Sequence, residues 1–159
     1  MRSASRFPER RKTAMSQSKR STPRPVAVAT MDDQRRVIAL LSAPSTYGSS
    51  VDEVRRIDTH SAIVFLAGDR AYKLKRAVRY DYLDFSTLES RLRACADEVR
   101  LNRRTAPDLY LGHRPITCGS DGSLQIDGEG TVVDWVVEMA RFDDSAVFDQ
   151  LAERGELDV

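Results

Sequence analysis

The sequence predicts an α+β domain in which an antiparallel sheet carries one long helix. Segments that alternate apolar and polar residues recur between residues 54 and 139, and short turns rich in Gly, Asp and Ser separate them. One segment near the middle instead repeats its apolar residues at helical spacing. A long helix has no place between the sheets of a β-sandwich, so we expect five antiparallel strands, one long helix and short helices at the ends.

Residues 1–30 differ from the rest of the chain in charge. They contain eight Lys and Arg but a single acidic residue, whereas residues 31–159 contain 17 basic and 23 acidic residues. With few apolar residues they cannot bury enough surface to order themselves, so we expect a disordered basic tail. It would act as an arm for nucleic acid or membrane, as a transit peptide, or have no function. The acidic balance of residues 31–159 argues against nucleic acid as a partner of the folded part.

A short helix and a first strand are predicted at the start of the folded part. Asp32 or Asp33 can cap a helix that Pro44 ends. Residues 54–59 then have the composition of a strand.

A β-hairpin is predicted next. Residues 63–67 are a continuous apolar run, a Gly-Asp-Arg turn follows, and residues 71–78 alternate with the period of a strand. On this second strand Lys73 and Lys75 leave the sheet on one face, and the apolar residues next to them face a core.

The long helix is predicted to begin at Ser86, because Ser86 and Glu89 have the spacing of a capping box. Pro107 ends it. Glu98 lies beside the apolar stripe of this helix, where a carboxylate needs a partner, and we expect a lysine of the neighbouring strand to supply it. The stripe consists of Leu88, Leu92, Cys95 and Val99.

Three further strands are predicted after the helix, over residues 109–117, 123–127 and 131–139, with Gly-rich turns between them. Together with the hairpin they make the five expected strands. In the last strand, alternate residues from Val133 to Met139 are expected to share one face.

Four blocks of the chain closely resemble the amino-terminal lobe of aminoglycoside-phosphotransferase-like kinases. They are VFLAGDRAYKLKR (64–76), LDFSTLESR (83–91), EVRLNRRTAPDLYLG (98–112) and VVDWVVEM (132–139). In particular they look like a bacterial group in which that lobe is fused to a second ATP-binding domain of the P-loop type. The resemblance is specific for the group and carries no information about a substrate.

The resemblance implies a nucleotide site. It places Lys75 on the phosphates of ATP, with Glu98 holding Lys75 and with Lys73 as the alternative phosphate ligand. An ordinary salt bridge between strand and helix is the competing interpretation of these residues. The resemblance also implies Thr59, His60 and Ser61 in the turn that covers the phosphates, and the backbone of Glu138, Met139, Ala140 and Arg141 at the adenine.

For activity, the resemblance implies the ATP-binding lobe of a small-molecule phosphotransferase. Residues 31–142 would form the kinase-like lobe and residues 143–159 the start of a second lobe. In the family, the His-x-Asp loop and the ligands of Mg²⁺ lie in that second lobe, so we expect this chain to be inactive alone and to depend on a second lobe or P-loop domain. The alternatives are a non-catalytic nucleotide-binding or docking module and a basic-armed adaptor.

The remaining chemistry-bearing residues predict no separate site. Cys95 and Cys118 lack the C-x-x-C spacing of a zinc or redox site, so we expect reduced packing residues. His60 and His113 are too isolated to predict a metal site. No apolar run is long enough to span a bilayer and no secretory signal is present, so we expect a cytoplasmic protein without a membrane partner.

Overall fold

The computed structural model describes residues 31–141, and of residues 31–33 it describes only the backbone. The expectations for residues 1–30 and 142–159 lie outside the described residues. The architecture is α+β, as predicted. Its elements are α1 (Met31–Ser42), the 3-10 helix η1 (Pro44–Tyr47), β1 (Val54–Asp58), β2 (Ala62–Ala67), β3 (Arg70–Lys75), β4 (Arg79–Tyr80), β5 (Leu83–Asp84), α2 (Leu88–Asn102), β6 (Tyr110–Cys118), β7 (Leu124–Ile126) and β8 (Thr131–Ala140).

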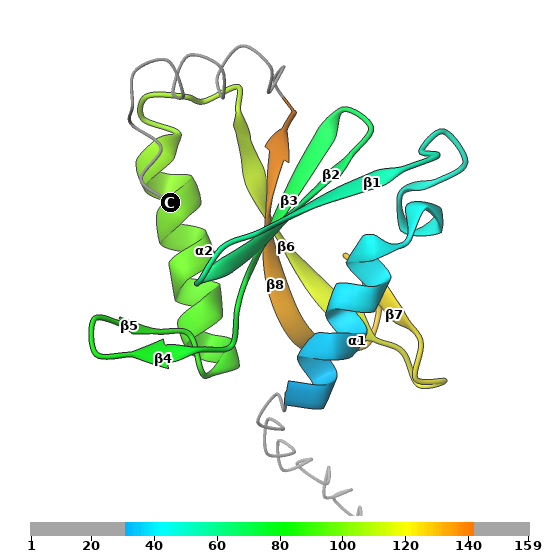
Figure 1. Ribbon diagram of the computed structural model, residues 1–159, viewed down its shortest axis with the longest axis horizontal. Coiled ribbons are helices and arrows are strands. Elements are labelled where there is room, and N and C mark those ends of the chain that lie inside the picture. Colours follow the sequence, from blue (N-terminus) through cyan, green and yellow to red (C-terminus); the bar gives the residue numbers. More distant parts are fainter. Residues whose placement is uncertain (1–30, 142–159) are drawn as a thin grey trace, which may run out of the picture.

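The main sheet has six antiparallel strands in the order β1-β2-β3-β8-β6-β7. The expected number of five was wrong, because it left out the strand predicted at residues 54–59. This strand, β1, joins the edge of the hairpin, where Val54 lies opposite Ala67. A separate ribbon of two short strands, β4 and β5, was not predicted. Figure 1 shows this ribbon beside the lower end of α2, at one side of the sheet.

The two helices cover opposite faces of the curled sheet (Figure 1). On the α1 face, Val37 and Leu41 of α1 are fully buried against the sheet. On the α2 face, Cys95 and Val99 of α2 pack against Val137 of β8. The buried sheet residues of the α1 core are Ile63, Phe65, Leu74, Ile116 and Val136.

Strand β3 presents its two faces to different surroundings. Leu74 is fully buried in the α1 core and Tyr72 packs against that core, so the predicted alternation is confirmed. The strand ends at Lys75, earlier than the expected end at Val78. It ends there because the Val78 N–H donates to the Arg76 carbonyl in a three-residue turn that directs the chain into β4.

A bulge in β8 changes which of its residues lie on the same face of the sheet. Trp135, Val137 and Met139 lie on the α2 face as predicted, but Val133 packs against the α1 core. The pairing of β8 with β6 shifts by one residue at this point, so that Val133 is left without a partner in the register. An extra residue in one strand reverses the alternation beyond it.

The N-cap of helix α2 lies one residue later than predicted, at Thr87 in place of Ser86. The expected capping box of Ser86 and Glu89 was wrong, because the N–H and hydroxyl of Ser86 both donate to the Asp84 carboxylate, at 2.9 and 2.6 Å. Thr87 caps the helix instead. Its Oγ1 accepts the Ser90 N–H at 3.0 Å, and its own N–H donates to the Ser90 hydroxyl at 3.2 Å.

We predict that Thr87→Ala lowers the free energy of unfolding by about 1 kcal/mol, because an orphaned amide of the first turn loses its acceptor. Ser86→Ala serves as the control and should cost less, since the Ser86 side chain bonds only to an exposed carboxylate. Denaturant unfolding followed by circular dichroism measures both. A larger loss in Ser86→Ala than in Thr87→Ala would contradict the observed cap.

Candidate functional site

A cleft of about 670 Å³ opens on the α2 side of the sheet, over β1, β2 and β3. Its lining is mostly apolar, and the side chains of Lys73 and Lys75 are its charged groups on β3. A concave site of this size with apolar walls and a few charged groups suits a small ligand, and the two ammonium groups can pair with an anionic part of it. Apolar lining residues include Ile57, Val64, Leu66, Ala71, Phe85 and Met139.

Both cleft lysines bond to one carboxylate. Lys73 Nζ donates to Glu98 Oε1 at 2.9 Å, and Lys75 Nζ donates to Glu98 Oε2. The sequence predicted a lysine partner for Glu98, and the structure brings both candidates to it. The Lys75 side chain is 10% exposed and that of Lys73 31% exposed, so Lys75 lies deeper in the cluster.

The ring of Phe85 supports the deeper lysine. Lys75 Nζ lies 5.4 Å from the centre of this ring, within the range of a cation–π interaction. Phe85 follows β5 and also lines the cleft. The β4–β5 ribbon, which was not predicted, therefore positions Phe85 as part of the cleft lining.

The lysines keep Glu98 ionised. Burial would raise the pKa of its carboxyl group, but hydrogen bonds and charge from Lys75 and Lys73 outweigh burial and hold the pKa below its ordinary value. One carboxylate thus faces two ammonium groups, and the cluster has a surplus positive charge at the cleft.

Lysine is used sparingly in this part of the chain. Among the 17 basic residues at positions 31–159, Lys73 and Lys75 are the only lysines and the others are arginines. An ammonium group is a compact point charge that binds phosphate without the fixed fork of a guanidinium. This compositional signal was available in the sequence and would have marked both residues without any structure.

The predicted phosphate-covering turn lies only in part at the cleft. Thr59 and Ser61 line it. The turn is closed by the Thr59 N–H, which donates to the Ala62 carbonyl at 2.9 Å, and by the Ala62 N–H, which donates to Thr59 Oγ1 at 3.0 Å. His60 is exposed outside the lining, with its ring 6.2 Å from that of Tyr80.

At the other end of the cleft, Met139, Ala140 and Arg141 contribute to the lining. The Ala140 N–H already donates to the Leu109 carbonyl at 2.9 Å, and the Arg141 N–H donates to the Asp69 carbonyl at 2.8 Å. A nucleobase held here would have to displace these bonds or use other backbone groups.

The Glu138 side chain lies on the opposite face of the sheet from the cleft. It accepts a hydrogen bond from Arg114 Nε at 2.7 Å, and Arg70 lies 3.8 Å from its other oxygen. Strand alternation separates Glu138 from Met139 in this way. Glu138 can therefore contribute to a site in the cleft only through its backbone, because its side chain lies on the other face of the sheet.

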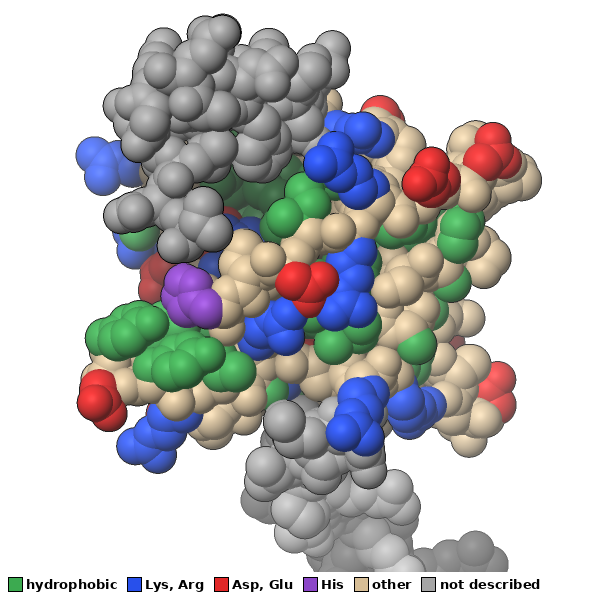
Figure 2. All heavy atoms as spheres, in the orientation of Figure 1, with side chains coloured by type: hydrophobic (Ala, Val, Ile, Leu, Met, Phe, Trp, Pro, Cys, Tyr) green, Lys and Arg blue, Asp and Glu red, His purple; other side chains and the backbone are tan. Residues whose placement is uncertain are grey.

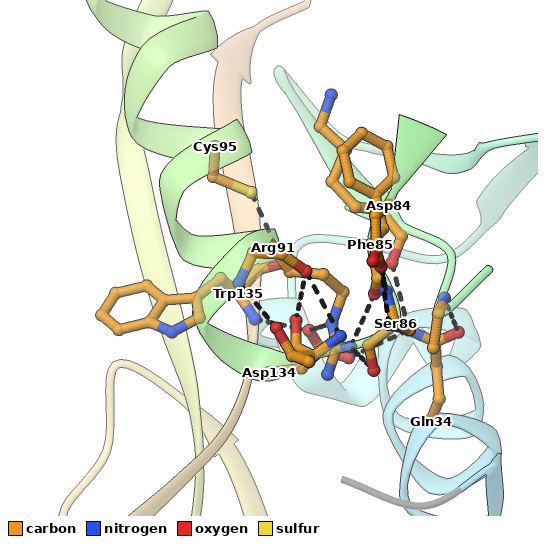
Figure 3. A network of polar contacts seen from close by, with 12 residues as sticks. Gln34, Asp84, Phe85, Ser86, Arg91, Cys95, Asp134 and Trp135 are labelled. Atoms are coloured by element: carbon orange, nitrogen blue, oxygen red, sulfur yellow. Dashed lines mark hydrogen bonds and ion pairs between the residues drawn. The ribbon is translucent and has the colours of Figure 1, made fainter. Parts of the chain in front are cut away.

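Sequence reasoning missed a buried ion pair beside the cleft. Arg91 of α2 and Asp134 of β8 are 0% and 1% exposed, and Arg91 Nε donates to Asp134 Oδ1 at 2.6 Å (Figure 3). Each residue interrupts an apolar pattern: Arg91 lies between Leu88 and Cys95 on the helix stripe, and Asp134 lies within the run VVDWVV. Two charges of opposite sign, each inside an apolar pattern on a separate element, were the sequence signal that could have predicted this ion pair.

Both cysteines are free thiols, consistent with the expected reduced state. Cys95 is fully buried, and burial raises the pKa of its thiol to about 12. Its Sγ lies 3.9 Å from the Trp135 carbonyl. Cys95 is therefore a packing residue of the α2 core.

Within residues 31–141, no helix is long and apolar enough to cross a membrane. Nor does any group of three or more His, Cys, Asp or Glu side chains in this range have an arrangement that could hold a metal ion.

The chain is similar to three mycobacterial proteins described as uncharacterized, one from Mycobacterium bovis and two from strains of Mycobacterium tuberculosis. Each is 47% identical over 68 residues, which are 43% of this chain and 14% of the length of the relative. The aligned segment thus spans a small part of much longer proteins. No family model matches the chain, and no solved structure matches it.

We predict that the lysine–glutamate cluster stabilises the fold at neutral pH and less in acid. The folded pKa of Glu98 is lowered, so its contribution is present above the ordinary glutamate pKa of about 4.3 and is lost as the pH falls through the folded value. Urea unfolding of the wild type and of Glu98→Gln, measured at several pH values between about 7 and 3, tests this. The difference in free energy of unfolding should shrink toward acid pH, and a constant difference would contradict the assignment.

Proposed function

We propose that residues 31–141 form the ATP-binding lobe of a phosphotransferase that acts on a small molecule, with the phosphates of ATP bound at Lys73 and Lys75. The observation that carries the proposal is the convergence of these two lysines of the third strand on Glu98 of the helix that follows. Protein-kinase-like enzymes use a lysine on their third strand, paired with a glutamate of the next helix, to bind nucleotide phosphates.

An ordinary salt bridge explains this cluster less well than a ligand site does. One cation is enough to neutralise Glu98, yet two lysines bond to it, and Lys75 and Glu98 are both largely buried. Burying charges costs free energy that their mutual attraction often fails to recover. Apolar side chains of similar size would stabilise the fold at least as well as this cluster, so stability alone does not explain why charged residues lie here. An anion in the cleft would take up the surplus positive charge.

The walls of the cleft suit the rest of a nucleotide. Ala71, Val64 and Met139 offer apolar surface for a base next to the lysines. Thr59 and Ser61 lie on the same side, where hydroxyl and backbone groups can approach a phosphate. In this proposal the base lies toward β8 and the phosphates lie toward Lys75.

The chemical step would need groups beyond those described. Phosphoryl transfer requires a residue that orients the hydroxyl nucleophile, and Mg²⁺ that neutralises charge on the phosphates. The described residues offer no set of carboxylates that fits Mg²⁺, so we assign no step to it. A second lobe or a P-loop domain remains the proposed source of these groups, and the lobe is proposed to be inactive alone.

A second candidate function is a non-catalytic nucleotide-binding or docking module. It is favoured by an exposed aromatic pair on the β4–β5 ribbon, where the rings of Tyr80 and Tyr82 stack with centroids 5.7 Å apart. They are 39% and 76% exposed. Figure 2 shows an apolar patch over this ribbon next to a histidine.

We predict that the full chain binds ATP and that Lys75→Met and Lys73→Met each weaken binding by about tenfold to a hundredfold, because each removes a charge-assisted hydrogen bond to phosphate. Isothermal titration calorimetry measures the affinity. Arg93→Met is the matched control, since Arg93 lies on the exposed side of α2 and pairs only with Glu89.

The series ATP, ADP, AMP and adenosine separates a nucleotide-binding lobe, whether catalytic or not, from a docking module that binds no nucleotide. A phosphate site at the lysines predicts that affinity falls steadily along the series. A flat series, or lysine variants that bind ATP as well as the wild type does, would contradict the proposed phosphate site and leave the docking module as the better explanation.

A further inference from the structure

A buried polar network joins both helices to β8. Asp134 of β8 accepts hydrogen bonds from Arg91 Nε at 2.6 Å and from Gln34 Nε2 of α1 at 3.1 Å, and its own strand supplies the Trp135 N–H at 2.9 Å (Figure 3). The carboxylate is therefore satisfied by groups from three separate elements.

The α1 arm of this network holds the end of β3. Gln34 Nε2 donates to the Lys75 carbonyl at 3.0 Å, and Gln34 Oε1 accepts the Ala77 N–H at 2.8 Å. One amide side chain thus spans the point where the strand ends. It fixes the backbone that carries the deeper lysine.

On the α2 side of the network, Arg91 holds the segment that carries Phe85, whose ring lies against Lys75. Arg91 Nη1 donates to the Phe85 carbonyl at 3.0 Å and to the Ser86 carbonyl at 3.4 Å. The Phe85 ring is the one that lies against Lys75 Nζ. Glu98, which bonds to Lys75, lies about two turns further along the same helix as Arg91.

From these contacts we propose that Gln34, Asp134 and Arg91 are positioning residues, which set the Lys75 ammonium group against Glu98 and Phe85 for phosphate binding. The inference rests on the proposed function. None of the three lines the cleft, so they act through Lys75.

The composition of the network supports a role in positioning. Gln34, Arg91 and Asp134 are all buried, and Arg91 Nη2 is buried without a hydrogen-bond partner among the described residues. Apolar side chains of similar size would fill this space at a lower desolvation cost. Hydrogen bonds have a direction that apolar contacts lack, so the network fixes where the end of β3 and the residue after β5 lie.

The network contacts the backbone of Lys75, whereas none of its hydrogen bonds goes to Lys73. This asymmetry distinguishes a positioning role from a purely structural role of the network. A variant of the network should weaken only the part of ATP affinity that depends on Lys75.

We predict that Gln34→Met weakens ATP binding of the full chain by about tenfold and leaves adenosine binding unchanged, because only the phosphate contact is misplaced. Added to Lys75→Met, it should cause no further loss. Added to Lys73→Met, it should keep its tenfold effect. Calorimetry provides the affinities, and Gln125→Met, at an exposed position of β7, is the matched control.

Asp134→Asn, which keeps the side-chain size, replaces Gln34→Met if the latter fails to fold by circular dichroism. Equal losses for ATP and adenosine, or an undiminished loss in the Lys75→Met background, would overturn the positioning role while leaving the nucleotide site in place. If the wild type binds ATP no better than adenosine, the proposed function itself fails and this inference fails with it.

Discussion

The site depends on one carboxylate that is shared by two ammonium groups. Glu98 can bond to both Lys73 and Lys75 only because β3 places them on the same face, two residues apart, opposite the C-terminal half of α2. The start of α2 at its Thr87 cap determines which helix residue lies there. In the proposed function, the surplus positive charge of the cluster favours an anionic ligand in the neighbouring apolar cleft.

In the proposed function, one face of β3 stabilises the fold and the other face carries the lysines that bind the ligand. Leu74 is sealed in the α1 core, which keeps the strand in place, while the lysines on either side of it reach the cleft. The polar network through Gln34 and Asp134 connects these faces, because it reaches from α1 through the end of β3 to α2. In the proposed function, the packing of α1 therefore influences a site that α1 does not touch.

The features that depend on local periodicity could be predicted from the sequence. Those that depend on contacts with other segments could not. The period of two placed Lys73 and Lys75 on one face, and helical spacing placed Glu98 beside the apolar stripe; the structure brings these residues together. The bulge at Val133 depends on the register with β6, which no local pattern encodes. The choice of Thr87 over Ser86 as the cap depends on Asp84, which captures the nearer hydroxyl. The contact of Arg91 with Asp134 joins positions 43 residues apart, and only the assembled fold reveals it.

The central claim is that Lys73 and Lys75 together receive the phosphates of a nucleotide, and lysine reactivity tests it most directly. Limited acetylation of the full chain, located by tandem mass spectrometry, can be compared with and without saturating ATP. Lys12 and Lys19, the other two lysines of the sequence, serve as the internal reference. The account predicts that ATP lowers acetylation of both Lys73 and Lys75 relative to this reference, whereas adenosine does not. Unchanged acetylation of both residues at saturating ATP would contradict it.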